Sequence, residues 1–357
     1  MQPDSSIKRV LIYRVGSLGD TTVALPCFHL IARSYPAAER VLLTNFPVHV
    51  KAPAAAAVLG DSGLVQRYMR YSVGTRNPLE LLTLAREIRR FKPEVLVYLM
   101  PVRPMPSVRR DAFFFRWVCG VKRIVGLPGQ AELERSFDAA SGRYEAEAHR
   151  LARTLAELGD AEPERIANWD LVLTEAERGK ARAMLGELAN KPLVVCGPGT
   201  KMQAKDWGQE NWRALLERVG REHPGCGLAL IGAAEDREVS EFAAAGWQGP
   251  KVNLCGALKP RETAAVLEGA RVFLGPDSGP MHLAAATDVP CVIAFSARGL
   301  PGVWYPVGER HQIIYHQTSC YGCNLESCEI EQRRCLTSIG VDEMASAFGR
   351  VFAAQRG

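Results

Sequence analysis

The sequence predicts an α/β fold made of two doubly wound, parallel-sheet domains, and three observations lead to this prediction. Short apolar runs alternate with amphipathic stretches of helical length, which is the pattern of repeated βαβ units. The alternation occurs twice, before and after a polar segment near residues 158–175. Glycine-containing turns follow several of the apolar runs, at the strand ends where such sheets bind ligands.

Length and composition fit this fold. The chain has 357 residues, of which 47% are hydrophobic and 23% charged, so two buried cores can form and disorder is excluded. No apolar run approaches the ~18 residues of a membrane span. The segment Met1–Ser6 has no signal-peptide pattern. We therefore expect a cytoplasmic protein, with contact at the inner face of the membrane as a peripheral option.

Charge is unevenly distributed along the chain. The net charge of +5 is mild and does not predict a nucleic-acid partner, and we expect none. Residues 67–123 hold 13 basic and 4 acidic residues, a local charge of +9 that exceeds the surplus of the whole chain. Such a region either attracts an anionic partner or forms a solvated helix face, and both interpretations stay open.

The first series of elements begins with an apolar strand. Lys8–Val15 is predicted as that strand, and the helix over Thr21–Ser34 ends before Pro36. The later elements of this series are a strand over Arg40–Thr44, a helix over Pro78–Phe91, a strand over Glu94–Met100, a helix over Pro106–Cys119 and a strand over Arg123–Gly126.

The second series begins at Thr174, which is predicted to cap a helix with Glu177 at the third helical position. Its elements are a helix over Glu175–Ala189, a strand over Leu193–Cys196, a helix over Gln209–Glu222, a strand over Gly227–Ile231, helices over Arg237–Ala245 and Pro260–Gly269, a strand over Arg271–Leu274, a helix over Pro280–Thr287, a strand over Val289–Phe295 and a helix over Val341–Ala354.

A glycine turn, Gly16–Thr21, follows the first strand and places Asp20 at a helix N-terminus. A carboxylate in that position can take a proton from a substrate hydroxyl. It can equally act as a helix cap that bonds the amide of Thr22 or Val23. The turn lacks the third glycine of a dinucleotide-binding fingerprint.

A second glycine turn, Gly199-Thr200-Lys201, follows the strand that ends at Cys196, and Lys205 lies four residues further on. Backbone amides and ammonium groups in such a loop can bind the oxygens of a diphosphate. The alternative is ordinary solvated loop charge. The Gly-Lys-Ser/Thr of a Walker motif is absent.

The third loop concentrates polar groups before a helix. Asp277, Ser278 and His282 lie within six residues, and Gly279 and Pro280 begin the helix. Pro280 suits the first helical position, and the free amides near Gly279 can point at an anion. His282 alone would be a structural histidine; in this loop a ligand-binding role is favoured.

The loop Gly232–Asp236 carries a further candidate, Glu235, since a carboxylate after a strand can bind ribose hydroxyls. An acidic pair that caps the next helix is the alternative.

Four of the ten cysteines form a cluster, Cys320-x2-Cys323-x4-Cys328-x6-Cys335. Four thiols within sixteen residues can hold a tetrahedral zinc or iron ion in a structural role. Reduced thiols or a labile disulfide are the alternatives. The six other cysteines lie singly in or near apolar segments and are expected in the core.

Taken together, these residues resemble glycosyltransferase family 9, the heptosyltransferases of lipopolysaccharide core synthesis. The Gly-Asp-Thr turn at residues 19–21, Lys205-Asp-Trp207 and the Asp277–His282 loop occur in the order of the family. The resemblance runs from residue 8 to about residue 340, and the third loop is its most specific part. The spacing of the cysteines is similar to that of heptosyltransferase II members.

The resemblance implies a GT-B architecture, with two Rossmann-like domains facing a central cleft. It implies an acceptor domain over residues 1–165, a donor domain over 166–340 with the cysteine cluster at 320–335, and a C-terminal helix over 341–357 that packs back on the N-terminal domain. The implied reaction is an inverting, metal-independent transfer from a nucleotide-diphosphate sugar, with ADP-heptose favoured. Its acceptor would be an anionic glycolipid of the lipopolysaccharide core or a related envelope glycan, and catalysis would require no cofactor.

The resemblance also implies roles for single residues. Asp20 matches the catalytic base and Lys205 the group that binds the leaving diphosphate. The donor-binding set is Gly199, Thr200, Lys201, Lys205, Glu235, Leu258, Asp277, Ser278, Gly279, Pro280 and His282; the acceptor-side set is Ser17, Gly19, Asp20 and Arg103.

Met202 and Gln203 stand where many members have more polar residues, so the identity of the donor sugar nucleotide stays undecided. The alternatives are a family enzyme that uses another nucleotide sugar for O-antigen, protein or small-molecule acceptors, a nucleotide-sugar epimerase or hydrolase on the same fold, and a non-catalytic nucleotide-binding scaffold.

Overall fold

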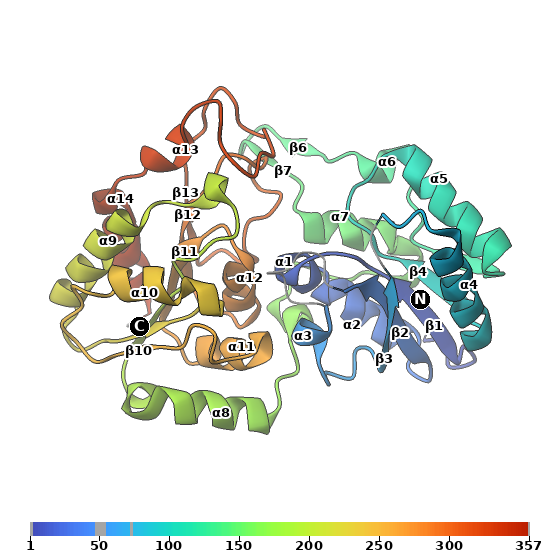
Figure 1. Ribbon diagram of the computed structural model, residues 1–357, viewed down its shortest axis with the longest axis horizontal. Helices are drawn as coiled ribbons and strands as arrows, with labels where there is room; N and C mark the ends of the chain where they lie inside the picture. The colour runs from blue at the N-terminus through green and yellow to red at the C-terminus, as the bar shows by residue number, and fades with distance from the viewer. Residues whose placement is uncertain (1–2, 47–54, 72–73, 356–357) are drawn as a thin grey trace. The chain divides into compact units, whose positions relative to one another are not determined.

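The computed structural model describes residues 3–46, 55–71 and 74–355 and divides into two compact units (Figure 1). The first unit consists of residues 1–138 and 145–172, and the second of residues 139–144 and 173–357. Residues 1–2 of the polar N-terminus, 72–73 of the basic stretch and 356–357 of the C-terminal segment lie outside the described residues. Each unit has its own parallel sheet, and each is described by itself.

The sheet of the first unit has five parallel strands in the order β3-β2-β1-β4-β5. The strands are β1 (Arg9–Tyr13), β2 (Glu39–Asn45), β3 (Arg67–Tyr71), β4 (Val95–Tyr98) and β5 (Arg123–Val125). Ile12 lies opposite Leu42 on one side and Val97 on the other, which fixes the register of the central strand. The winding direction reverses between β1 and β4, so ligands are expected at their carboxyl ends.

Helices cover both faces of this sheet. They are α1 (Leu18–Thr22), α2 (Leu25–Ser34), α3 (Ala55–Leu59), α4 (Pro78–Phe91), α5 (Met105–Phe113), α6 (Gln130–Leu133) and α7 (Glu147–Thr154), with a π-helix η1 (Phe114–Val118) and 3₁₀ turns η2 (Ala156–Leu158) and η3 (Ile166–Trp169). The single helix expected over Thr21–Ser34 is two helices, since Pro26 stands at the start of α2. The helix expected over Pro106–Cys119 changes to π geometry after Phe113.

The sheet of the second unit has six parallel strands in the order β10-β9-β8-β11-β12-β13. They are β8 (Leu193–Cys196), β9 (Gly227–Leu230), β10 (Lys251–Asn253), β11 (Val272–Pro276), β12 (Cys291–Phe295) and β13 (Gln312–Tyr315). Two short strands come earlier in the chain, β6 (Phe137–Asp138) in the first unit and β7 (Arg143–Tyr144) in the second. Here the winding reverses between β8 and β11. The predicted fold class, two doubly wound sheets, is therefore confirmed.

The helices of the second unit are α8 (Glu175–Leu185), α9 (Gln209–Glu222), α10 (Arg237–Ala243), α11 (Pro260–Glu268), α12 (Gly279–Ala286), α13 (Arg334–Thr337) and α14 (Val341–Ala354), with 3₁₀ turns η4 (Gly186–Asn190), η5 (Gln203–Lys205) and η6 (Ala234–Asp236). Thr174 caps α8 as predicted, because its hydroxyl accepts from the amide of Glu177. Within the described ranges, no helix has the length and apolar character needed to cross a bilayer.

The C-terminal helix α14 packs within the second unit, which corrects the expectation that it returns to the N-terminal domain. Its buried side chains, among them Met344 and Phe348, join the core formed by Trp207, Trp212 and strands β8, β11 and β12. The indole N–H of Trp207 donates to the carbonyl of Ile339 just before the helix, at 3.0 Å. The sequence shows that this helix has one apolar face, and that face is occupied by the sheet of its own unit.

His311 fastens the start of β12. Its Nδ1 accepts from the backbone N–H of Cys291 at 3.1 Å, so Nε2 carries the proton and donates to the carbonyl of Val307 at 2.5 Å. Burial, helped by the charge of Arg310, lowers the pKa of this imidazole below 6.5. If Nδ1 were protonated as well, its N–H would face the N–H of Cys291, and the hydrogen bond between them could not form.

Candidate active site

Asp20 lies in the turn that follows β1, at the topological switch point of the first sheet. Its Oδ2 accepts from both the N–H and the hydroxyl of Ser17, each at 2.7 Å. It is thus the third residue of α1 and closes a capping box, in place of the expected bond to the amide of Thr22 or Val23. A Cβ at Gly16 would lie 2.3 Å from the Asp20 Cβ, so the turn requires glycine there. Gly19 is buried beside it.

The second carboxylate oxygen of Asp20 has a different environment. Among the residues that the structure describes, Oδ1 takes no hydrogen bond, and the side chain is half-buried. The carboxylate is therefore held at a fixed angle through Oδ2 while Oδ1 stays available to a substrate proton. That is the geometry a general base needs.

Two fully buried arginines lie beneath this turn. Arg14 donates through Nη1 to the carbonyl of Leu99 at 3.2 Å and through Nη2 to the carbonyl of Asp20. Arg150 donates to the carbonyl of Met100 at 2.9 Å. Both guanidinium groups thus fasten the carboxyl end of β4, and Arg14 ties it to the backbone of Asp20. The Nε atom of Arg14 has no partner in the described part of the chain.

Glu147 supplies the counter-charge for these arginines. Its carboxylate accepts from Arg150 at 2.8 and 2.9 Å and from Arg135, and only 1% of the Glu147 side chain is exposed. Burial opposes ionisation of Glu147, but the hydrogen bond and charge of Arg150, with Arg135 and Arg14, outweigh it and lower its pKa. Burial lowers the pKa of Arg14, while Asp20 and Glu147 oppose that shift.

These buried residues were not selected from the sequence. The signal available was an arginine, Arg14, directly after an apolar strand and directly before the glycine turn. Arginine is almost never buried without a partner, so its position could have prompted a search for a buried carboxylate.

Arg103, expected on the acceptor side, is engaged within its own unit. It forms an ion pair with Asp111, a buried residue whose Oδ2 also accepts from the hydroxyl of Tyr98 at 3.0 Å. The guanidinium is one-fifth exposed, so it stands near the end of β4 with a fixed orientation.

Lys205 and Asp277 meet at the switch point of the second sheet. Their Nζ and Oδ2 atoms are 2.9 Å apart, and the two side chains are 18% and 6% exposed. Lys205 comes from the loop after β8 and Asp277 from the end of β11, the strands between which the winding reverses. The structure therefore brings together two of the three predicted donor loops.

The helix α12 begins immediately after this ion pair. Ser278 precedes it, and Gly279 and Pro280 are its first two residues, so Pro280 stands one position later than expected. The hydroxyl of Ser278 is buried and has no partner among the described residues. His282 is buried one turn into the helix, with its ring 6.3 Å from that of Trp304. Unpaired helix amides, a lone hydroxyl and an ammonium group at one strand end suit a diphosphate.

In the loop Gly199–Lys205, the residues expected to bind the donor differ in their burial and contacts. Gly199 is required because a Cβ there would lie 2.3 Å from the side chain of Asp236. The hydroxyl of Thr200 lies 3.4 Å from the carbonyl of Met202, and the side chain of Lys201 is exposed. Of the two predicted lysines, Lys205 forms the ion pair with Asp277, and Lys201 is the more exposed.

The ribose candidate, Glu235, has an exposed side chain, and its neighbour Asp236 performs the capping role by accepting from the amide of Ala233 at 2.8 Å. The loop after β10 lies against this turn, since a Cβ at Gly256 would be 2.7 Å from Ala234. Leu258, in that neighbouring loop, is half-buried.

The cysteine segment, residues 320–335, lies against the Lys205 loop. The amide of Ala204 donates to the carbonyl of Glu326 at 3.0 Å, and the amide of Cys328 donates to the side chain of Gln203 at 2.8 Å. Arg333 donates to the carbonyl and carboxylate of Asp206 at 2.8 and 3.1 Å. This segment therefore fixes the backbone on both sides of Lys205, a connection that no sequence motif indicated.

The four thiols of this segment, whose spacing predicts a zinc or iron site, do not stand together as a ligand set in the described residues. Cys320, Cys323, Cys328 and Cys335 are free and partly exposed. Throughout the described ranges, no three His, Cys, Asp or Glu side chains gather closely enough to hold a metal ion. Two of the sulfurs have partners of their own: Cys328 accepts from the amide of Arg333 at 3.2 Å, and Cys335 lies 3.9 Å from the hydroxyl of Ser296. Cys320 and Cys328 nevertheless lie close enough to Cys335 for their charges to act on its thiol.

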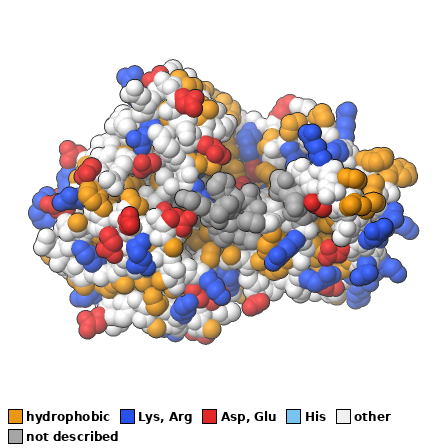
Figure 2. Space-filling model, viewed as in Figure 1, with side chains coloured by type: hydrophobic (Ala, Val, Ile, Leu, Met, Phe, Trp, Pro, Cys, Tyr) orange, Lys and Arg blue, Asp and Glu red, His pale blue; other side chains and the backbone are white. Residues whose placement is uncertain are grey.

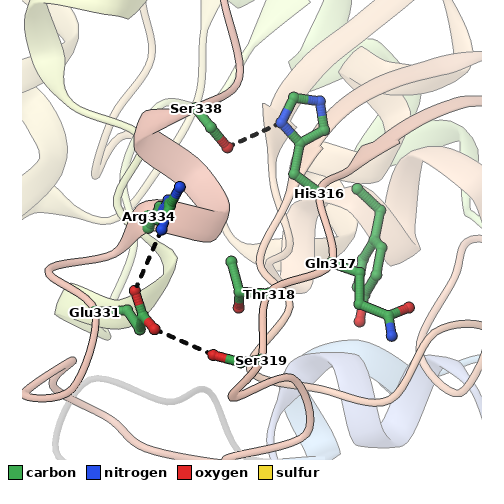
Figure 3. A pocket seen from close by; sticks show the side chains of 8 residues that line it. His316, Gln317, Thr318, Ser319, Glu331, Arg334 and Ser338 are labelled. Carbon is green, nitrogen blue, oxygen red and sulfur yellow. Dashed lines mark hydrogen bonds and ion pairs between the residues drawn. The ribbon is translucent and has the colours of Figure 1, made fainter.

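A surface pocket of about 680 Å³ lies beside the cysteine segment, beyond the end of β13 (Figure 3). Within it, His316 and Ser338 point toward one another, with Nδ1 and Oγ 2.9 Å apart. Glu331 accepts from the hydroxyl of Ser319 at 3.1 Å and lies near Arg334. None of the donor-binding residues expected from the sequence lines this pocket.

Similarity to known proteins identifies the family of this chain. The model of glycosyltransferase family 9 (heptosyltransferase) matches residues 117–333. Lipopolysaccharide heptosyltransferase 1 of Pseudomonas aeruginosa is 28% identical over 342 residues, which cover 90% of this chain and 87% of the relative. The family 9 glycosyl transferase of Veillonella parvula DSM 2008 aligns with a TM-score of 0.75 at 16% identity, over 99% of each chain.

The E. coli ADP-heptose LPS heptosyltransferase II aligns with a TM-score of 0.66 at 16% identity, over 98% of this chain and all of that one. At this identity the solved structures establish the GT-B fold, and the family model covers more than half of the sequence. The chain belongs to glycosyltransferase family 9 (heptosyltransferase) and is a glycosyltransferase.

Proposed function

We propose that this enzyme transfers heptose from ADP-heptose to the lipopolysaccharide core or a related envelope glycan, with inversion and without a divalent cation. The observation that carries the proposal is the ion pair of Lys205 and Asp277, 2.9 Å apart at the switch point of the second sheet. The relative in P. aeruginosa is a lipopolysaccharide heptosyltransferase, and the E. coli enzyme of the same fold is named for ADP-heptose.

On the acceptor side, the proposed base is Asp20. Its free Oδ1 takes the proton of an acceptor hydroxyl as the hydroxyl oxygen attacks the anomeric carbon of the donor sugar. The bond from that carbon to the diphosphate breaks, and the product has the opposite anomeric configuration. Ser17 holds the carboxylate in place through Oδ2, and Arg14 holds its backbone.

On the donor side, the diphosphate gains negative charge as it leaves. Lys205 supplies a fixed ammonium group, and the N-terminus of α12 supplies amide dipoles near Ser278. Together they provide the stabilisation that a divalent cation gives in other transferases. The basic stretch at residues 67–123, with +9 net charge in the sequence, suits the phosphates and acidic sugars of the acceptor.

The first test is thermal unfolding with ADP, UDP, GDP and CMP in parallel, since a ligand that binds only the folded state raises the midpoint. Selective stabilisation by ADP, lost in Lys205→Met, supports the proposed donor and site. Selective stabilisation by UDP or GDP retains the glycosyltransferase but assigns another sugar. No shift with any nucleotide contradicts the donor site.

The base is tested separately with Asp20→Asn. The amide keeps an acceptor oxygen for Ser17, so the variant should fold and bind ADP as the wild type does, yet lose at least about 10²-fold in turnover. Near-normal turnover in this variant refutes the assignment of Asp20.

A further inference from the structure

The outer layer of the first unit carries exposed apolar side chains on two neighbouring helices. Leu79 and Leu82 of α4 are 71% and 46% exposed, and Phe113 and Trp117 of α5 and η1 are 61% and 74% exposed. Single exposed apolar residues are ordinary, but four of this size on adjacent helices are not. The α4–α5 surface is defined here by these four residues and the exposed arginines of the same helices.

The two helices pack on the same face of the first sheet. Ile88 and Phe91 of α4 and Phe115 of η1 share one buried cluster. Arg89 lies close enough to Cys119, at the end of η1, for its charge to act on that thiol. The opposite sides of both helices therefore point outward together, and the right end of Figure 2 shows orange and blue side chains gathered where Figure 1 places α4 and α5.

The charge of this surface is one-sided. Five exposed arginines accompany the apolar residues and form no ion pair within the described part of the chain: Arg86, Arg89, Arg90, Arg109 and Arg116. On the same helices Asp111 is buried between Arg103 and Arg110, and Glu80 accepts from the hydroxyl of Thr75. Glu87 is the remaining exposed carboxylate there.

Helical periodicity places the exposed aromatic rings on one surface. Positions 106, 110, 113 and 117 follow one another on the outer side of α5 and η1, and two positions of helix separate the buried Phe115 from the exposed Trp117. Helices that lie in the plane of a membrane interface typically carry Trp and Phe beside arginines. The α4–α5 surface has this composition.

We propose that the α4–α5 surface docks the first unit on an anionic lipid bilayer. The rings of Phe113 and Trp117 enter the level of the headgroups, and the unpaired arginines neutralise lipid phosphates. A nucleic acid would use the arginines but leave the leucines and rings without a role, and a protein partner would not require so one-sided a charge. The inference goes beyond the proposed reaction and does not depend on which sugar is transferred.

Trp117 makes the test direct. Of the six tryptophans in the chain, four are at most 4% exposed and Trp304 is half-buried, so Trp117 dominates the response to external quenchers. The full-length protein is mixed with vesicles of 30% phosphatidylglycerol and 70% phosphatidylethanolamine, or of phosphatidylcholine alone, none of which contains a glycan acceptor. Sedimentation measures binding, and acrylamide quenching measures the burial of Trp117.

We expect binding to the anionic vesicles only, weakened by salt, with Trp117 protected from acrylamide. The double variant F113S/W117S should bind at least about tenfold more weakly, since the apolar contact is lost. Arg89→Glu with Arg90→Glu should weaken binding similarly, through charge. The matched control is Ile330→Ser, which removes a 63% exposed apolar side chain from the second unit and should leave binding unchanged.

Three results would overturn the proposal. They are no binding of the wild type to anionic vesicles, equal binding by F113S/W117S, and a dimer of the wild type that this variant abolishes, which would assign the surface to a second copy. Nucleotide stabilisation of the same variants shows that they are folded. Because that stabilisation concerns the second unit, a failure of the docking proposal leaves the proposed donor site standing, and the reverse holds too.

Discussion

Glu147 offers the sharpest test of how the first unit supports Asp20. Replacing it with alanine leaves Arg150, 1% exposed, and Arg14, fully buried, without a counter-charge. Arg135 loses its ion-pair partner as well. Three positive charges would then share a buried space beneath the turn, with the carboxylate of Asp20 as the nearest compensation.

The magnitude follows from that geometry. Removing one partner of a buried ion pair destabilises a protein by about 3–5 kcal/mol, because the remaining charge stays desolvated. An ion pair near the surface contributes at most about 1 kcal/mol. Glu145, which pairs with the partly exposed Arg153 at 2.9 Å, is the matched control two residues away. We expect Glu147→Ala to cost several times as much stability as Glu145→Ala.

Urea unfolding followed by circular dichroism, at several pH values, measures this difference. The pKa of Glu147 is lowered in the folded state from 4.5, so its stabilisation is complete above that pH and is lost as the pH falls through the folded-state value. The gap between wild type and Glu147→Ala should therefore be constant near neutral pH and shrink only below about 4.5. Equal destabilisation by the two alanine variants at pH 7 would refute the reasoning.

Three further predictions concern the second unit. Lys205→Met should weaken ADP binding by about tenfold or more in calorimetry, and adding Asp277→Asn should recover folding stability without recovering affinity; recovery of both would contradict the phosphate role. Because burial lowers the pKa of His311 in the folded state, the unfolded chain binds a proton at a higher pH than the folded chain does. The melting temperature should therefore fall as the pH drops below about 6.5, and His311→Gln should make this pH dependence weaker. Hydrogen bonds from the amides of residues 333, 331 and 330 lower the pKa of Cys328 against the effect of its slight burial, whereas burial raises the pKa of Cys335. Alkylation followed by peptide mass spectrometry should therefore find that Cys328 reacts faster than Cys335. Thiols that react only after a chelator is added would show a bound metal instead.

The central elements of both sheets could be predicted from the sequence because their signals are local. The strand Leu193–Cys196 and the helices Pro78–Phe91, Gln209–Glu222 and Val341–Ala354 have the predicted bounds. Their apolar period is complete, and a proline or a polar turn marks their ends. The strands of the two large sheets that were missed, β3, β10 and β13, are edge strands, in which arginine, lysine and glutamine hide the alternation. The two-residue strands β6 and β7 were also missed.

The site was predictable to the level of its loops. Asp20, Lys205 and Asp277 stand at the switch points, as the doubly wound order requires. What the loops contact was not predictable, because it depends on packing between distant segments. The spacing of the cysteines gives no information on where each sulfur turns, and the apolar face of α14 does not say which sheet it covers.

The contact between the cysteine segment and the Lys205 loop limits which segments family members can exchange by recombination. Residues more than a hundred positions apart, such as Gln203 and Cys328, must match for the lysine to keep its place. A recombinant that takes residues 173–357 from one parent inherits the matched set intact. A crossover between β8 and β13 would join segments that were never selected together, so we expect viable hybrids of this family to inherit both segments from one ancestor.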